Sequence, residues 1–109
     1  MVSTTNISAT GLKPRHFRVI CDILEAHLPE GKCRVYLFGS RAGDTVRPVS
    51  DIDLAVEKIS ENTALHLHTI RTAFEESNLP YRVDLVNLGN IRTDLKDTIK
   101  KEGIMIWGR

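Results

Sequence analysis

Three aspartates interrupt apolar segments of the chain and are the residues best suited to chemistry. Asp51 and Asp53 open the segment DIDLAVE, and Asp84 lies inside the apolar segment YRVDLVN. Aspartate is depleted in strands because its carboxylate is costly to desolvate. Side chains two residues apart leave the same face of a strand, so Asp51 and Asp53 would share one face. If Asp84 converges on that face, the clustered carboxylates would repel one another unless cations neutralise them.

This group of carboxylates predicts a site for hard divalent cations. Mg²⁺ prefers oxygen ligands, and a paired metal site needs several carboxylates on a rigid support, which neighbouring strands supply. Taken singly, each acid also has a purely structural explanation. Asp51 can begin a strand, and Asp53 can cap a loop. Asp84 can pair with Arg82 or Arg34. The metal site is the interpretation that explains all the acids together.

A second candidate for chemistry is the Gly39–Ser40 pair, which follows the apolar segment CRVYLF. A turn at this point that opens into a short helix would offer free backbone N–H groups to an anion. Glycine lets a phosphate approach the backbone closely, and the serine hydroxyl adds a donor. The ligand predicted for this arrangement is a triphosphate whose tail is bridged to the acids by Mg²⁺.

The segments that must position these residues alternate predicted helices with predicted strands. Apolar residues recur at spacings of three and four in the helical segments, and β-branched and aromatic residues fill the strands. Ser60 is expected to cap the second helix. We expect helices over 12–28, 61–77 and 91–102, and strands over 33–39, 51–57, 81–87 and 103–107. This order predicts a small sheet covered by helices, an α/β or α+β sandwich.

Length and composition are those of one ordinary domain. The 109 residues are 41% hydrophobic and 27% charged, as in globular domains with a single core. We expect residues 1–10 to form a flexible N-terminus and residues 11–109 to form one domain. The net charge of +1 gives no strong field for nucleic acid or membranes, so a phosphate ligand needs a local site. Neither a signal peptide nor a membrane span is recognisable, which predicts a cytoplasmic protein without a membrane partner.

The stretch GSRAGDTVRPVSDID, with ten residues between Ser40 and Asp51, resembles the motif of the DNA polymerase β-like nucleotidyltransferases. The resemblance runs from Val35 to about Trp107 and is closest to the minimal nucleotidyltransferases. It implies the fold of that superfamily, a small mixed sheet with helices packed on it. The resemblance also implies that Asp51 and Asp53 bind Mg²⁺.

The remaining site residues follow from the same resemblance. In the family the Gly-Ser turn holds the nucleotide's phosphates, which implies a nucleotide-binding role for Gly39, Ser40 and Arg41. A third acid in the following strand completes the metal site and helps to activate the acceptor hydroxyl, a place that Asp84 fits. Many relatives read GSRAR at the turn, whereas this chain places Gly43 and Asp44 after GSRA, which would weaken nucleotide binding.

The resemblance implies transfer of a nucleoside monophosphate, AMP from ATP, with two Mg²⁺ ions. The implied acceptor is a tyrosine hydroxyl of a partner HEPN-domain toxin, which the chain would silence as an antitoxin. One alternative is a non-catalytic nucleotide-binding module that neutralises its partner by occlusion. Transfer to a small molecule such as an aminoglycoside is disfavoured, because an acceptor-binding domain is not expected in a chain of this length. Nucleic acid is not expected as a direct partner.

Several other residues that invite a functional interpretation are better explained structurally. His66 and His68 are two apart and lie on different sides of a helix, so we expect surface histidines and no metal pair. Cys21 and Cys33 lack CxxC spacing and are expected to be reduced core residues. Trp107 is expected to be a core or dimer contact.

The C-terminal quarter of the chain adds two further expectations about its surface. A basic group is expected to be a solvated helix face, with a partner contact as the alternative; its members are Arg92, Lys96, Lys100 and Lys101. The apolar final strand IMIW would lie at a sheet edge and offers a route to a homodimer.

Overall fold

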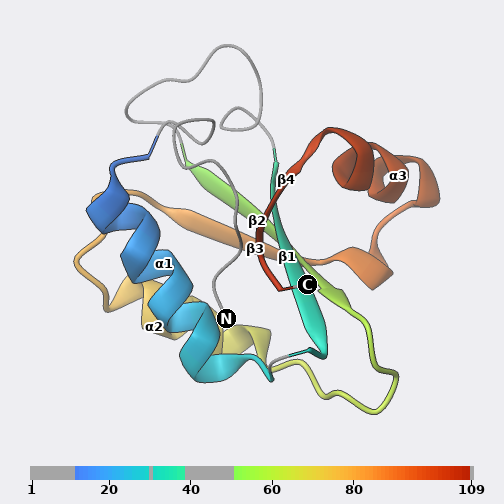
Figure 1. Ribbon diagram of the computed structural model, residues 1–109, viewed down its shortest axis with the longest axis horizontal. Coiled ribbons are helices and arrows are strands. Elements are labelled where there is room, and N and C mark those ends of the chain that lie inside the picture. The colour runs from blue at the N-terminus through green and yellow to red at the C-terminus, as the bar shows by residue number, and fades with distance from the viewer. Residues whose placement is uncertain (1–11, 30, 39–50, 109) are drawn as a thin grey trace.

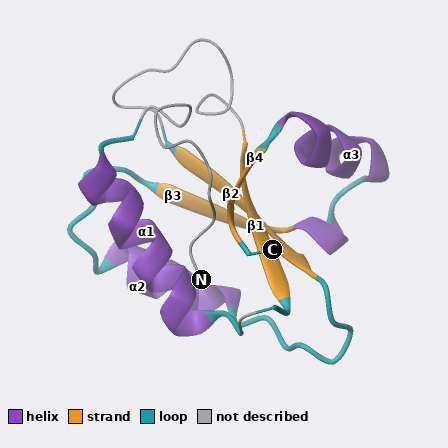
Figure 2. Ribbon diagram, in the orientation of Figure 1, coloured by secondary structure: helices purple, strands orange, loops and turns teal. Residues whose placement is uncertain are grey.

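A mixed sheet of four strands forms the centre of the molecule and carries helices on both faces (Figures 1 and 2). The structure is a computed structural model that describes residues 12–29, 31–38 and 51–108. The sheet order is β3-β2-β1-β4. The strands are β1 (Cys33–Phe38), β2 (Ile52–Lys58), β3 (Val83–Asn87) and β4 (Ile104–Trp107). β1 pairs antiparallel with β2 and β4, whereas β2 and β3 run parallel. This arrangement confirms the expected α/β class with a small mixed sheet.

The helices are divided between the two faces of the sheet. Figure 1 shows α1 (Pro14–His27) and α2 (Leu67–Glu75) together on one side, and α3 (Thr93–Glu102) on the other. The short 3-10 helix η3 (Leu88–Asn90) directly follows β3 and begins where Asn87 accepts a hydrogen bond from the N–H of Gly89. Because β2 and β3 are parallel, the chain between them must cross from one end of the sheet to the other, and α2 lies in that crossover.

The main core lies between the sheet and the pair formed by α1 and α2. Ile20 and Leu24 on α1 are fully buried, and so are Leu54 and Val56 on β2. The buried positions on α1 repeat at helical spacing, and on β2 Ile52, Leu54 and Val56 face the main core, whereas Asp53, Ala55 and Glu57 leave the other face. A smaller core lies under α3 and η3, where Ala55 packs with residues of those helices. The consequence is that the face of β2 opposite the main core is only partly covered.

The start of the second helix differs from the prediction. Ser60 does not cap a helix, because α2 begins at Leu67 with His66 at its N-cap position. The backbone N–H of Ser60 donates to the carbonyl of Lys32, and its own carbonyl accepts from the N–H of Thr63 at 3.1 Å. The segment after β2 is therefore held as a turn against the start of β1, so residues 61–66 of the predicted helix are not helical.

Several structural predictions for single residues are confirmed. Cys21 and Cys33 are buried free thiols, and burial raises the pKa of Cys21 to about 11. Trp107 belongs to the core, and its indole Nε1 donates to a carboxylate oxygen of Glu25 at 3.1 Å. His66 and His68 are exposed.

Other predictions concern the limits of the chain and its surface. None of the helices in the described ranges has the length and apolarity needed to cross a membrane. β4 lies at the edge of the sheet, as expected, and the homodimer through that edge stays a prediction. The flexible segment over 1–10 lies outside the described residues, and the single domain over 11–109 stays a prediction.

Candidate active site

Asp53 and Asp84 lie directly opposite each other on neighbouring strands. They are register partners in the parallel pair of β2 and β3, so their side chains leave the same face of the sheet. Asp51 precedes β2 and is exposed, two residues from Asp53. The structure therefore brings together, at the start of two parallel strands, the acids that the sequence singled out.

The register that pairs these acids is set by the apolar residues that alternate with them along β2 and β3. Leu54 and Leu85 are also register partners, and both are buried under the helices of the opposite face. A shift of one residue would turn the aspartates into that core and the leucines out to solvent. The hydrophobic pattern thus fixes the position of Asp53 relative to Asp84.

Burial and neighbouring negative charge act in the same direction at Asp53. Burial raises the pKa of Asp53, and the negative charges of Asp84 and Asp51 raise it further. Among the described residues, Arg82 places its Nε 3.6 Å from a carboxylate oxygen of Asp84, in a pair where the Arg82 side chain is largely exposed and that of Asp84 is half-exposed. One structural explanation considered for Asp84, its pairing with Arg82, is therefore present alongside the acid group.

The donor set fits a hard divalent cation in its chemistry. The oxygens belong to carboxylates, and a cation would offset the repulsion that raises the pKa of Asp53. Within the described ranges, no three side chains of the His, Cys, Asp and Glu types already stand at the spacing of a metal site. The acids are thus close enough to interact, and their metal-binding role stays a prediction.

The predicted phosphate-binding residues follow β1 in the sequence, and β1 pairs with β2 on the side opposite to β3. Phe38, the last residue of β1, is the register partner of Asp53. Gly39, Ser40 and Arg41 follow it in the sequence and lie outside the described residues, as do Gly43 and Asp44. The chain therefore enters the predicted nucleotide-binding turn at the acidic end of the sheet.

A pocket of about 730 Å³ adjoins the acids and is lined mainly by residues of β3, of α2 and of the connection between them. Asp53 and Asp84 form part of its lining, together with residues of α2 and of the connection into β3. Arg71 of α2 donates from Nη2 to the backbone carbonyl of Leu85 at 2.9 Å. The volume lies in the range of small-molecule binding sites.

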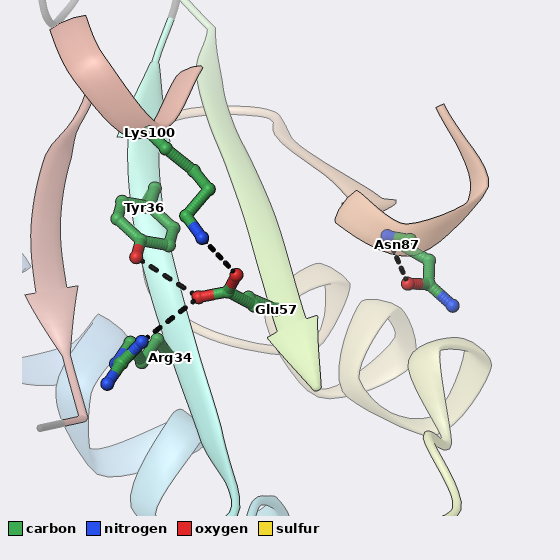
Figure 3. Close-up of polar contacts among 6 residues, drawn as sticks. Arg34, Tyr36, Glu57, Asn87 and Lys100 are labelled. Atoms are coloured by element: carbon green, nitrogen blue, oxygen red, sulfur yellow. Dashed lines mark hydrogen bonds and ion pairs between the residues drawn. The ribbon is translucent and has the colours of Figure 1, made fainter. Parts of the chain in front are cut away.

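A second polar cluster, which sequence reasoning missed, occupies the other end of the same face of β2 (Figure 3). Glu57 accepts hydrogen bonds from Lys100 Nζ at 2.8 Å and from the Tyr36 hydroxyl at 3.2 Å, and Arg34 Nη1 lies 3.5 Å away. Burial raises the pKa of Glu57, but the hydrogen bond and charge of Lys100 outweigh this effect, with help from Tyr36 and Arg34. The net result is a lowered pKa. We call these residues the Glu57 cluster.

The Glu57 cluster bears on two interpretations of the sequence. Arg34, one of the partners considered for Asp84, pairs with Glu57. The basic helix face is exposed at Arg92, Lys100 and Lys101, as expected. Lys100 also joins α3 to the sheet, and Arg92 forms an exposed pair with Asp94 at 3.2 Å. Strand alternation was the feature of the sequence that could have drawn attention to Glu57, because it places Glu57 on the same face as Asp53.

The fold and the site together define an α/β domain in which paired carboxylates stand at the start of two parallel strands, and a glycine-serine pair follows β1 in the sequence. Residues 25–109 match the family model described as polymerase beta, nucleotidyltransferase. The chain belongs to this family and is a nucleotidyltransferase, as the motif predicted.

Similar proteins come from both sequence and structure. A probable protein adenylyltransferase MntA of Haemophilus influenzae is 29% identical over 102 residues, which cover 94% of this chain and 88% of the relative. A toxin–antitoxin crystal structure with AMP-PNP has a TM-score of 0.66 at 29% identity, over 85% of this chain and 73% of that one. A mutant of the MntA–HpeT toxin–antitoxin complex has a TM-score of 0.64 at 29% identity, over 90% and 74%.

Proposed function

We propose that this chain is the antitoxin of a toxin–antitoxin pair and transfers AMP from ATP to a hydroxyl of its toxin partner. The observation that carries the proposal is the opposition of Asp53 and Asp84 within the region that matches the nucleotidyltransferase family. The similar adenylyltransferase and the similar toxin–antitoxin complexes support both the donor and the kind of partner. We further propose that the partner is a HEPN-domain toxin and that the acceptor is a tyrosine.

The roles that we propose for the residues extend the family motif to the matching positions of this chain. Gly39, Ser40 and Arg41 bind the phosphates of ATP at the end of β1. Asp51, Asp53 and Asp84 would hold two Mg²⁺ ions, which supply charge neutralisation for the triphosphate and a lowered pKa for the acceptor hydroxyl.

Asp84, which is half-exposed beside the pocket, orients the acceptor and takes the hydroxyl proton on a carboxylate oxygen. A bond forms between the hydroxyl oxygen and the α-phosphorus. The bond from that phosphorus to the bridging oxygen breaks, and pyrophosphate leaves with the electron pair. Positioning and charge neutralisation supply most of the rate enhancement in this type of transfer.

A label-transfer assay tests the proposed activity. The tagged protein is purified from its own cells with whatever binds it, supplied with Mg²⁺, and given ATP labelled at the α or the γ phosphate. Label from the α position alone should appear on the co-purified protein and should be absent with Asp53→Asn. If a partner co-purifies and neither label transfers from any of the four nucleotides, neutralisation by occlusion replaces the proposal.

Mass spectrometry of the labelled partner tests the proposed acceptor. The modified peptide should carry AMP on a tyrosine side chain. A modified serine, threonine or histidine would contradict the tyrosine acceptor while leaving the nucleotidyltransferase activity intact. Sequencing the partner identifies its domain class and decides the HEPN assignment.

A further inference from the structure

A second pocket lies at the end of the parallel strands opposite to the acids. Its volume is about 310 Å³, and its lining comes from the end of β2, from η3 with the residue before it, and from α3. A strand rises about 3.3 Å per residue, so Lys58 in this lining is roughly 16 Å along β2 from Asp53. The crevice outside the carboxyl ends of parallel strands is a common place for ligands in open sheets. This pocket is therefore separate from the candidate active site and is suitably placed for a ligand of its own.

Two lysines give this pocket its positive charge. Lys58 at the end of β2 is exposed, Lys96 on α3 is half-buried, and both line the pocket. Within the described ranges, neither ammonium group forms an ion pair. The chain as a whole has a net charge of only +1, so two unpaired lysines around one small pocket are a local excess of positive charge. Such an excess attracts an anion.

The carboxylate among the lining residues, Glu57, already has partners of its own. Its Oε2 accepts from Lys100 Nζ at 2.8 Å, and its Oε1 accepts from the Tyr36 hydroxyl at 3.2 Å (Figure 3). Arg34 Nη1 lies 3.5 Å from the same Oε1. The negative charge of Glu57 is therefore offset within the Glu57 cluster, and the two lysines of the pocket keep their charge available for a ligand.

Neutral donors complete the lining of the pocket. The Oδ1 of Asn87 accepts from the backbone N–H of Gly89 at 3.0 Å (Figure 3), which orients the amide so that its Nδ2 remains as a donor. Asn90 brings a second side-chain amide. Gly89 is exposed and has no side chain, so a ligand can approach its backbone closely. Because ammonium and amide nitrogens donate hydrogen bonds and do not accept them, this lining suits an anion.

A phosphate group fits these donors better than a carboxylate does. A phosphate monoester carries about 1.5 to 2 negative charges at pH 7 and has three oxygens that accept hydrogen bonds. A carboxylate carries a single charge on two oxygens, so one lysine would satisfy it. The donors of this pocket come from three elements, β2, η3 and α3, and can reach separate oxygens. The volume lies at the lower end of the range of small-molecule sites, which favours a small phosphate-bearing ligand.

We propose that this pocket binds the phosphate group of a small molecule. Lys58 and Lys96 offset the charge of the phosphate, and the amides of Asn87 and Asn90 donate to its oxygens. The bound phosphate joins β2 to α3 beside the Glu57 cluster and so stabilises the folded protein. The site takes no part in the proposed transfer of AMP, and its test does not depend on that activity.

Titration with two phosphate probes tests the site. Inorganic phosphate or AMP is added to the ¹⁵N-labelled full chain with EDTA, at an ionic strength held constant with potassium chloride. The backbone N–H signals of Gly89, Asn90 and Lys96 should shift in a saturable manner with a Kd of roughly 1 mM or tighter. EDTA removes the divalent cations through which a nucleotide would bind the acids, so the signals of Asp53 and Asp84 should stay in place. Shifts confined to Asp53 and Asp84, or shifts that do not saturate, would overturn the inference.

A matched pair of variants on α3 separates binding in the pocket from general attraction to charge. Lys96 lines the pocket, whereas Lys101 is exposed on the same helix and lies outside the lining. Lys96→Gln should raise the Kd for inorganic phosphate about tenfold, because a charged donor is lost. Lys101→Gln makes the same change of charge and should keep the Kd within about twofold. Equal weakening in both variants would contradict the site. Lys58→Gln repeats the comparison from β2 if Lys96→Gln melts well below the wild-type protein.

The two probes and a third anion identify the group that is recognised. A lower Kd for AMP than for inorganic phosphate would support a phosphate-bearing organic ligand, and equal values would support recognition of the phosphate alone. Acetate, titrated in the same way, should bind at least about tenfold more weakly than phosphate. Acetate binding as tight as that of phosphate would overturn the choice of phosphate and indicate the carboxylate of an acidic protein segment.

Discussion

Asp53 and Glu57 stand on the same face of the same strand, and their surroundings shift their pKa values in opposite directions. Burial raises the pKa of both carboxylates. Glu57 then meets Lys100, Tyr36 and Arg34, and its pKa falls. Asp53 meets Asp84 and Asp51, and its pKa rises further.

The difference separates a structural carboxylate from one that is a candidate for function. The Glu57 cluster joins α3 to β1 and β2, and each of its bonds is made within the protein. The negative charges of Asp84 and Asp51 disfavour the charged form of Asp53, so this arrangement costs stability. A carboxylate in a pocket wall that its neighbours destabilise is a candidate for chemistry, because none of its contacts among the described residues accounts for its presence.

The largest expected difference between Asp53 and Glu57 is in the rate of catalysis. Asp53→Asn should lower the rate of AMP transfer by about a thousandfold or more, because it removes a proposed ligand of the metal ions. Glu57→Gln should keep the rate within roughly threefold, since Glu57 lies at the far end of the face. The initial rate of label transfer from α-labelled ATP measures both variants. Comparable losses of transfer rate in the two variants would show that Asp53 and Glu57 do not differ in their contribution to catalysis.

The second expected difference is in stability, where the substitution at Glu57 has the larger effect. Glu57→Gln should lower the free energy of unfolding by about 1 kcal/mol, because Lys100 and Arg34 lose a charged partner at a partly exposed site. Asp53→Asn should raise it by roughly 0.5 kcal/mol at pH 7 without metal, since the repulsion is relieved but is screened by solvent. Urea unfolding at pH 7 in the presence of EDTA gives both values. A destabilised Asp53→Asn variant would mean that Asp53 makes a favourable contact in the fold.

The two carboxylates should also respond to pH with opposite signs. The pKa of Asp53 is raised from its ordinary 3.8, so the folded protein binds the proton more tightly and stability falls as pH rises from 3.8 through the raised pKa. The pKa of Glu57 is lowered from its ordinary 4.5, so its stabilisation is complete above 4.5 and is lost as pH falls through the lowered pKa. Unfolding free energies of the wild type and both variants between pH 3 and pH 7 would show the two trends. Parallel curves for the wild type and Asp53→Asn would refute the effect at Asp53.

The smallest expected difference is in the melting temperature, between variants of Lys100 and of Arg82. Lys100 lies 2.8 Å from Glu57, whereas Arg82 lies 3.6 Å from Asp84 with 77% of its side chain exposed. Exposed ion pairs contribute little, so Arg82→Ala should shift the melting temperature by less than about 2 °C. Lys100→Ala should lower it by roughly 3 to 5 °C, because Glu57 is left with fewer partners in a partly buried place. Scanning calorimetry resolves this difference, and equal shifts would remove the distinction between the two pairs.

The parts of the fold that follow from local pattern were predictable from the sequence. The helix at α1 follows from helical spacing, because one face of it is buried. The strand at β1 follows from its β-branched and aromatic residues, and alternation along β2 separates the acids from the core-facing apolar residues. The start of α2 was not predictable in this way. Ser60 has the chemistry of a helix cap, but the carbonyl of Lys32, distant in the sequence, binds its backbone and holds a turn there. Tertiary contact outweighed a local preference.

The candidate site was partly predictable for the same reason. Alternation places Asp53 and Asp84 outside the core, but it does not reveal that their strands are parallel neighbours in this register. The family motif supplied that link. The role of Lys100 could not be predicted, because its partner Glu57 comes from a strand that only the folded sheet brings under α3.

The alkylation rates of the two buried thiols can report how the protein opens. Cys21 lies on α1 and Cys33 begins the central strand β1, and both are shielded from solvent. A thiol reacts with an alkylating reagent only as an exposed thiolate, so neither should be modified while the helix lies on the sheet. Equal alkylation rates would show that α1 and the sheet separate and unfold as one unit, and faster modification of Cys21 would show that the helix detaches first.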